Sequence, residues 1–239
     1  YQGIELVVNH PESLPASQLL AEIRGLGLEV SAIATGGLAP LENLTLLAQS
    51  PAVRQQAAER LEALLVFAAQ VNAPLLTLGS FRGKCLADSK TADEQALKQA
   101  LERGSQVASR CGVKIAIEPL SRYESNCLNK VDEVLAWVAE IGSPALGVLF
   151  DTYHANIEES NLCDSIHQAA AQKRLFHVHL GDSNRLPPGQ GHIDFPGIFA
   201  ALKALKYRGF VSAELLRQPD ADSAARLTID YCRPYLSHS

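Results

Sequence analysis

The segment L-G-V-L-F-D, residues 146–151, is an apolar run of strand-forming residues that ends in a single carboxylate. Three other segments also combine apolar strand-forming residues with a polar residue at or near the end: V-K-I-A-I-E (113–118), L-F-H-V-H-L (175–180) and F-V-S-A-E-L (210–215). The polar residues at or near their ends are Glu118, Asp151, His179 and Glu214. They are 33, 28 and 35 residues apart (118 to 151, 151 to 179, 179 to 214). Each spacing matches one strand–helix unit, so we expect four consecutive strands whose ends converge.

Strand-like and helical patterns alternate along the whole chain. The predicted strands are Ile4–Val8, Leu28–Ala34, Pro74–Gly79, Val113–Glu118, Leu146–Asp151, Leu175–Leu180 and Phe210–Leu215. Between them, residues at helical spacing predict helices at Ala52–Val71, Ala92–Ser109, Lys130–Ile141, Leu162–Gln172 and Pro196–Lys206. This alternation is typical of parallel strands joined by helical crossovers. No low-complexity linker interrupts it, so we predict one domain over residues 1–239.

A closed barrel of this kind has eight strands, and the sequence predicts seven. The chain contains no methionine and starts at Tyr1, just before the first predicted strand. We therefore predict a (β/α)8 TIM barrel whose first strand–helix unit is missing from the N-terminus, with a gap between the first and last strands present. The alternative is an open doubly wound sheet, which needs no eighth strand.

Alternation along the strands predicts which side chains enter the barrel. Residues at odd and even positions point to opposite faces, and the branched apolar face belongs against the helices. Glu118 therefore points inward, opposite Ile115 and Ile117. The same reasoning places Asp151, His179 and Glu214 inside, and it places Phe176 outside, against the helices.

Glu118, Asp151, His179 and Glu214 are predicted to hold one divalent cation. Three carboxylates that face one another repel and cannot all ionise unaided, and a cation removes this repulsion. The oxygen-rich set suits Mn²⁺ or Mg²⁺ better than structural zinc. We expect Mn²⁺ first, with Mg²⁺ or Co²⁺ as alternatives. Any one of these residues alone would be interpreted as a turn, cap or packing residue.

Composition narrows the range of partners. With 47% hydrophobic and 20% charged residues the chain resembles an ordinary globular protein, and its net charge of −5 argues against nucleic acid. The five cysteines form no C-x-x-C motif, which favours free thiols in a reducing, cytoplasmic compartment. No apolar run approaches the roughly 20 residues of a membrane helix. We expect a small-molecule partner, no membrane contact and possible self-association.

The residues also resemble a known family. The segments I-E-P-L-S-R-Y-E (117–124), F-D-T-Y-H-A-N-I-E-E (150–159), F-H-V-H-L-G-D-S-N-R (176–185) and G-Q-G-H-I-D-F (189–195) are similar to the xylose isomerase-like barrel superfamily. The resemblance is nearest to ketose 3-epimerases of the tagatose/psicose type and to related keto-sugar-acid epimerases. It implies the four metal ligands already selected from the strands. It also implies substrate contacts from Glu124, His154 and Arg185.

Each implied contact has a structural alternative. Glu124 could instead pair with Arg122, His154 could be a capping or packing residue, and Arg185 could be an exposed loop cation. His177 is expected to support the site or to pack in the core without ligating the metal. His192 and Asp194 are expected to order a glycine-rich loop.

The expected reaction is epimerisation of a ketose or keto-sugar acid through an enediolate. In this hypothesis Glu118 and Glu214 remove and return a proton from opposite sides of one carbon. The same residues would also serve a hydroxypyruvate-type or aldose–ketose isomerase. Two other classes compete: a hydrolase of the endonuclease IV type, which needs more histidines for three zinc ions, and a metal-binding barrel without catalysis.

Overall fold

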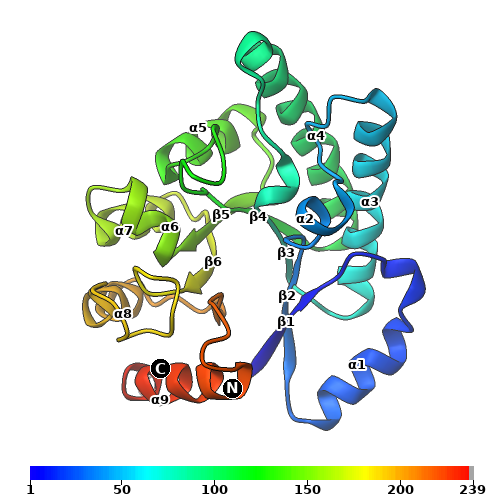
Figure 1. The fold of residues 1–239 in the computed structure, drawn as a ribbon. Helices are drawn as coiled ribbons and strands as arrows, with labels where there is room; N and C mark the ends of the chain where they lie inside the picture. Colours follow the sequence, from blue (N-terminus) through cyan, green and yellow to red (C-terminus); the bar gives the residue numbers. More distant parts are fainter. Residues whose placement is uncertain (237–239) are drawn as a thin grey trace.

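The computed structural model of the chain describes residues 1–236. Seven parallel strands form one sheet in the order β1 to β7, with helices outside it (Figure 1). The strands are β1 Gly3–Val7, β2 Glu29–Ala34, β3 Leu75–Leu78, β4 Lys114–Ile117, β5 Leu146–Asp151, β6 Leu175–Leu180 and β7 Val211–Ala213. The α-helices are α1 Ala16–Gly25, α2 Leu38–Glu42, α3 Pro51–Gln70, α4 Lys90–Cys111, α5 Val131–Ile141, α6 Thr152–Glu158, α7 Leu162–Ala171, α8 Phe195–Ala204 and α9 Ala221–Leu236.

The strand order settles the choice between the two predicted architectures. Each strand from β1 to β6 pairs in parallel with the strand that follows it in sequence. A doubly wound sheet would reverse its order at a switch point, and no reversal occurs here. The barrel prediction is confirmed, and all seven strands lie within a few residues of their predicted positions.

The five predicted helices are present as α3, α4, α5, α7 and α8. Within residues 1–236, four further α-helices lie outside the predicted ranges, and α6 is the most informative of them. It has seven residues and begins directly after β5, where the Asp151 side chain accepts hydrogen bonds from the backbone of Tyr153 and His154. A helix this short carries almost no periodicity in its sequence, so its N-terminal cap is the only local signal.

The ring of strands is open between its ends. Within residues 1–236, β1 pairs only with β2 and β7 only with β6. The two ends still approach each other, because the ring of Phe210 lies directly against the α-carbon side of Gly3. The hydroxyl of Tyr1 donates a 2.7 Å hydrogen bond to the carbonyl of Ala225 in α9, which lies beside this opening (Figure 1). The predicted gap is therefore present.

The core has an outer and an inner part. The outer part lies between sheet and helices and includes Ile115, Ile117, Val148 and Phe150, as alternation predicts. The inner part fills the barrel and consists of Ala32, Leu75, Ala116 and Leu149.

The prediction for Phe176 is wrong. Its side chain packs against the inner cluster instead of the helices. The pairing of β5 with β6 steps from Val148–Leu175 to Leu149–His177, so Phe176 is skipped and the alternation is broken by a bulge. Gly147 leaves the space that the ring needs, because a β-carbon there would lie 2.5 Å from the ring carbons of Phe176.

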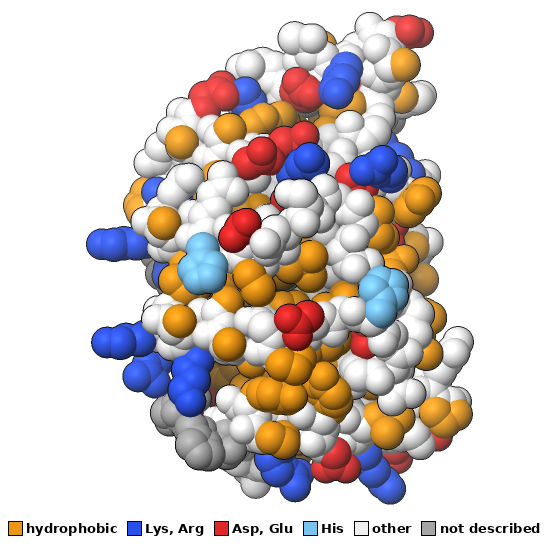
Figure 2. Space-filling view, turned by 90° about the vertical axis from the view of Figure 1, so that its left-hand side faces the viewer, with side chains coloured by type: hydrophobic (Ala, Val, Ile, Leu, Met, Phe, Trp, Pro, Cys, Tyr) orange, Lys and Arg blue, Asp and Glu red, His pale blue; other side chains and the backbone are white. Residues whose placement is uncertain are grey.

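Surface properties agree with the composition. Acidic and basic side chains are both scattered over the face that carries α7 and α8, with hydrophobic side chains between them (Figure 2). All five cysteines are free thiols. Among the helices of residues 1–236, none combines the length and apolar character needed to cross a bilayer.

Candidate metal centre and active site

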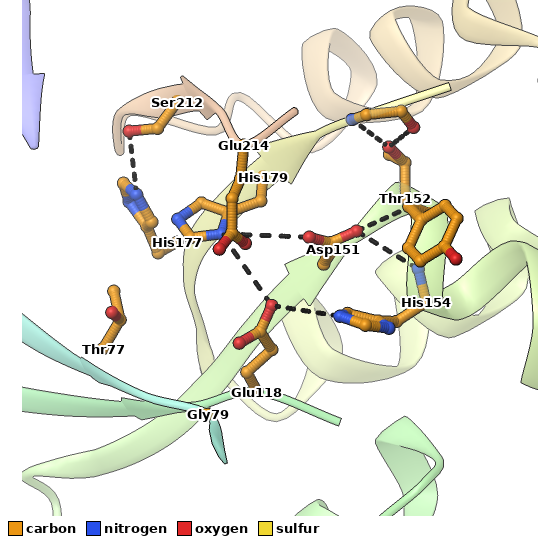
Figure 3. Close-up of polar contacts among 12 residues, drawn as sticks. Thr77, Gly79, Glu118, Asp151, Thr152, His154, His177, His179, Ser212 and Glu214 are labelled. Atoms are coloured by element: carbon orange, nitrogen blue, oxygen red, sulfur yellow. Dashed lines mark hydrogen bonds and ion pairs between the residues drawn. The ribbon is translucent and has the colours of Figure 1, made fainter. Parts of the chain in front are cut away.

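Four side chains from consecutive strands meet at the carboxyl end of the barrel. Glu118 follows β4, Asp151 ends β5, His179 lies in β6 and Glu214 follows β7. One potential ligand atom from each lies within 4.8 Å of the others. Figure 3 shows the side chains of all four pointing toward one another. The structure thus brings together the four residues that the strand pattern selected.

One ring nitrogen of His179, Nδ1, lies at the centre of this group. It is 2.9 Å from Glu214 Oε2, 3.9 Å from Glu118 Oε1 and 3.9 Å from Asp151 Oδ2. Glu118, Asp151 and His179 are buried, whereas the side chain of Glu214 is 44% exposed. The cluster is therefore closed on the barrel side and open toward solvent at Glu214.

The donor atoms fit a divalent cation. Glu118 Oε1 and Asp151 Oδ2 are buried, and neither has a hydrogen-bond partner among the described residues. Buried carboxylate oxygens without partners are strongly unfavourable, and a cation would satisfy both at once. Three carboxylates and one imidazole nitrogen also suit a hard divalent ion such as Mn²⁺ or Mg²⁺.

The pKa values in the metal-free cluster reflect the same crowding. Burial raises the pKa of Glu118 well above its usual range, and the charges of Glu214 and Asp151 add to the effect. Burial and the charge of Glu214 raise the pKa of Asp151 to about 7. Burial lowers the pKa of His179, but the carboxylates of Glu5 and Glu214 outweigh it and hold that pKa well above its usual range. Without a cation, these groups retain protons that a cation would displace.

Two local features hold the carboxylates in place. Asp151 Oδ1 accepts hydrogen bonds of 2.7 Å and 3.2 Å from the backbone N–H groups of Tyr153 and His154, which leaves Oδ2 facing the cluster. Gly79, at the end of β3, provides the space for Glu118. A β-carbon at Gly79 would lie 2.4 Å from Glu118 Oε2, so any side chain there would displace the carboxylate.

The three predicted substrate contacts line the same site. The guanidinium of Arg185 lies 3.2 Å from His154 Nε2, 3.5 Å from Glu214 Oε2 and 3.8 Å from Glu124 Oε1. It stacks over the ring of Tyr153 at 4.7 Å. His154 is buried, 4.0 Å from Glu118 Oε1, and burial together with Arg185 lowers its pKa to about 3. His154 is therefore neutral, whereas Arg185 beside these carboxylates stays charged.

The alternative partner for Glu124 is wrong. Arg122 pairs with Glu158 instead, through Nε at 3.0 Å and Nη2 at 2.8 Å. Arg185 is also no free loop cation, because its side chain is 21% exposed and faces the carboxylates of the site. Glu124 itself has a 44% exposed side chain and stays available at the rim.

The remaining polar residues of the prediction order the surroundings. His177 Nε2 lies 3.0 Å from both Glu5 Oε2 and Ser212 Oγ, outside the four-residue cluster. His192 Nδ1 contacts Ser183 Oγ at 2.9 Å, within the loop before α8. Asp194 caps α8 by accepting from the backbone N–H of Gly197.

Sequence reasoning missed Glu5 and Arg82. Glu5 lies in the middle of β1 and contacts both histidines of β6, and its one local signal is a charged residue inside an apolar strand. Arg82 is fully buried and donates hydrogen bonds to four backbone carbonyls, including that of Glu118 at 2.7 Å. The other acceptors are the carbonyls of Gly79, Cys127 and Leu128. A buried arginine held by carbonyls of distant loops leaves no pattern in the sequence.

Known proteins share this architecture. Residues 1–235 match the family described as xylose isomerase-like TIM barrel. A D-psicose 3-epimerase of Enterocloster bolteae is 32% identical over 194 residues, which cover 80% of this chain and 64% of that protein. An L-ribulose 3-epimerase of Methylomonas sp. is 41% identical over 115 residues, 48% of this chain and 40% of that protein.

A solved structure supports the same relationship. The crystal structure of 3-keto-D-glucoside 4-epimerase from E. coli superposes with a TM-score of 0.85 at 26% identity, covering 98% of this chain and 89% of that one. The matches to the two curated epimerases span 64% and 40% of those proteins. From the match over residues 1–235 and the seven-stranded parallel barrel, the chain belongs to the xylose isomerase-like TIM barrel family.

Proposed function

We propose that the protein is a metal-dependent epimerase of a ketose or keto-sugar acid. In this proposal one divalent cation is bound by Glu118, Asp151, His179 and Glu214, and Mn²⁺ is the proposed metal. The observation that carries the proposal is the group of three carboxylates around His179 Nδ1, in which two buried carboxylate oxygens have no hydrogen-bond partner among the described residues. The relatives named as 3-epimerases and as a 4-epimerase support the reaction class.

Glu118 and Glu214 are the proposed proton-transfer groups. They reach the site from β4 and β7, two strands that are separated by β5 and β6, so they approach a substrate carbon from different directions. Their environments also differ. Burial raises the pKa of Glu118, whereas the partial burial of Glu214 is outweighed by His179 and Arg185, which hold its pKa at about 2. Without a cation, the two carboxyl groups therefore titrate in well-separated pH ranges.

A divalent cation bound here would polarise the substrate carbonyl and make the neighbouring C–H more acidic. Glu214 then removes the proton from one face to leave an enediolate, and Glu118 returns a proton to the opposite face, which inverts the carbon. For the other epimer the two residues exchange roles. Arg185, backed by His154 and Tyr153, offers N–H donors to the oxygen on which negative charge develops.

The endonuclease-type alternative finds little support at the strand ends. Beyond the four-residue cluster, the described residues contain one further group that could hold a metal, formed by Glu5, His177 and His179. The ends of β2 and β3 supply Thr35 and Gly79, and the hydroxyl of Thr35 is occupied by a 2.8 Å hydrogen bond to the carbonyl of Thr77. A three-metal hydrolytic centre needs ligands at these positions.

The test is incubation of the Mn²⁺-loaded protein with a panel of ketoses and keto-sugar acids in D₂O, followed by NMR. Epimerisation should place one deuterium on a carbinol carbon next to the carbonyl, with both configurations formed. An aldose product would instead assign the isomerase reaction. Glu214→Gln is the matched variant, because the amide keeps the shape but cannot accept the proton. If metal-loaded protein exchanged no C–H proton in any substrate, the proposed function would be wrong.

A further inference from the structure

Glu5 connects β1 to the candidate metal centre through the two histidines of β6. Its side chain is 15% exposed and points into the barrel. Glu5 Oε2 lies 3.0 Å from His179 Nε2 and 3.0 Å from His177 Nε2, and Glu5 Oε1 lies 3.2 Å from His179 Nε2. One carboxylate therefore faces the ring nitrogens of both histidines, on the side away from the three ligand carboxylates.

The two nitrogens of His179 have different neighbours. Nδ1 faces Glu118, Asp151 and Glu214, whereas Nε2 faces only Glu5 among the contacts described. A neutral imidazole has one N–H donor and one nitrogen with a free lone pair, and an ionised carboxylate can only accept. The hydrogen bond to Glu5 thus requires a proton on Nε2. Nδ1 lies 2.9 Å from Glu214 Oε2, and once a cation displaces the proton shared there, the lone pair of Nδ1 points at the cation site.

From this geometry we propose that Glu5 is the positioning residue of the metal centre: it fixes the tautomer and ring orientation of His179 so that Nδ1 ligates the cation. This inference rests on the proposed metal-dependent function. A histidine ligand whose second nitrogen donates to a carboxylate is a more basic and better oriented ligand, and removal of such a carboxylate typically costs about 10–100-fold in metal affinity.

His177 supports Glu5 from the same side. Its Nδ1 is buried and has no partner among the described residues, so a proton there would be an unsatisfied donor. The proton belongs on Nε2, where both Glu5 Oε2 and Ser212 Oγ lie at 3.0 Å. The two imidazole rings are 5.1 Å apart and edge to face, at 80°. Two N–H groups thus hold the Glu5 carboxylate in one orientation.

Glu5, His177 and His179 could also be read as a second cation site, since their donor atoms are close together. The separations of 3.0 Å are ordinary hydrogen-bond lengths, and each is explained by a histidine N–H. A second cation would require His179 to give up both ring protons while it ligates at Nδ1. The positioning role needs no such ionisation.

The experiment compares Mn²⁺ binding by the unmodified protein, Glu5→Ala, Glu5→Gln and Ser212→Ala, using isothermal titration calorimetry. We expect Glu5→Ala to weaken Mn²⁺ binding about 10–100-fold. Glu5→Gln should lose less, because its amide oxygen still accepts from one histidine. Ser212→Ala removes only the second contact of His177 and should leave the affinity unchanged. Thermal unfolding with a chelator present verifies that each variant is folded.

Histidine ¹⁵N NMR of the diamagnetic Mg²⁺-loaded protein supplies a second readout that does not depend on turnover. In the unmodified protein and in Ser212→Ala, His179 should carry its proton on Nε2, with slow exchange against solvent. In Glu5→Ala the Nε2–H resonance should exchange rapidly with solvent, because its acceptor is gone.

Three outcomes would overturn the inference. They are equal Mn²⁺ affinity in Glu5→Ala and the unmodified protein, equally slow exchange of the His179 Nε2–H proton in both, or two bound cations per chain with both sites dependent on Glu5. If the unmodified protein bound no divalent cation, the proposed function would fail together with this inference. Normal binding that is insensitive to Glu5 would remove the inference alone.

Discussion

Asp151→Asn should separate the stability of this protein from its metal binding. The carboxylate has two distinct oxygens: Oδ1 caps α6 through two backbone N–H groups, and Oδ2 faces the cluster without a partner among the described residues. Asparagine can keep the capping oxygen and place its NH₂ group where Oδ2 was. That group can donate to the neighbouring carboxylates but has no lone pair for a cation. We therefore expect loss of metal binding together with a more stable metal-free protein.

The magnitude follows from the pKa of Asp151. Burial and the charge of Glu214 raise it from 3.8 to about 7, and one pKa unit corresponds to about 1.36 kcal/mol. Ionised Asp151 thus destabilises the metal-free fold by about 4 kcal/mol as an upper bound. Because the folded-state pKa is the higher one, the cost is absent below pH 4, grows as the pH rises, and is complete above pH 7. Asp151→Asn removes it, which predicts a Tm increase on the order of 10 °C at pH 8 for a chain of this size.

The assay is thermal unfolding from pH 4 to pH 8, in chelator and with added Mn²⁺. In chelator, the stability advantage of Asp151→Asn should grow with pH. With Mn²⁺, only the unmodified protein should gain stability, since only a folded state that binds the cation is stabilised by it.

Asp182→Asn is the matched control, because Asp182 is also fully buried but is fully paired. It accepts from the backbone N–H groups of Ser183, Ile193 and Gly189, and these bonds outweigh burial and lower its pKa. This variant should be destabilised at neutral pH. If Asp151→Asn were less stable than the unmodified protein at every pH in chelator, or kept its Mn²⁺ response, the reasoning about the cluster would be refuted.

Three further predictions concern the site. Gly79→Ala should weaken Mn²⁺ binding about tenfold. The new β-carbon would lie 2.4 Å from Glu118 Oε2, so the carboxylate must move by at least 0.6 Å (3.0 − 2.4). Gly36→Ala is the control and should bind Mn²⁺ normally, because no atom lies near its β-carbon. Mn²⁺ affinity should rise with pH from pH 5, by about tenfold per pH unit for each proton displaced, because the pKa of Asp151 is raised to about 7 and that of Glu118 is raised well above its usual range. An affinity that did not change with pH would contradict the displacement of protons by the cation. Arg185→Gln should keep the Mn²⁺ affinity but lower turnover by a factor on the order of 10²–10³, measured as the initial rate of epimerisation. Normal turnover in this variant would exclude Arg185 from stabilising the developing charge.

The four candidate ligands were predictable from local pattern. Each lies at or near the end of an apolar run, and alternation along the strand is a short-range property that places inward and outward residues before any contact forms. Spacings of 33, 28 and 35 residues then suffice to put the four on neighbouring parallel strands. The convergence at His179 Nδ1 follows from these regularities.

The position of Phe176 and the presence of α6 could not be predicted from local pattern. Phe176 was misplaced because a bulge in the β5–β6 pairing breaks strict alternation, and the space that admits its ring comes from Gly147 on the neighbouring strand. The helix α6 was missed because seven residues carry too little periodicity, although its cap, Asp151, was already selected for another reason. In both cases a tertiary or capping interaction outweighs the pattern.

The sequence by itself thus predicted the barrel class and determined its seven strands and the four residues that point into its mouth. Only the tertiary structure decided which groups surround them: Glu5 behind His179, Gly79 against Glu118 and Arg82 under the loop carbonyls. The physical reason is the range of the interactions. Strand and helix patterns act over a few residues, whereas Glu5 and His179 are 174 positions apart and meet only when the sheet curls into a barrel.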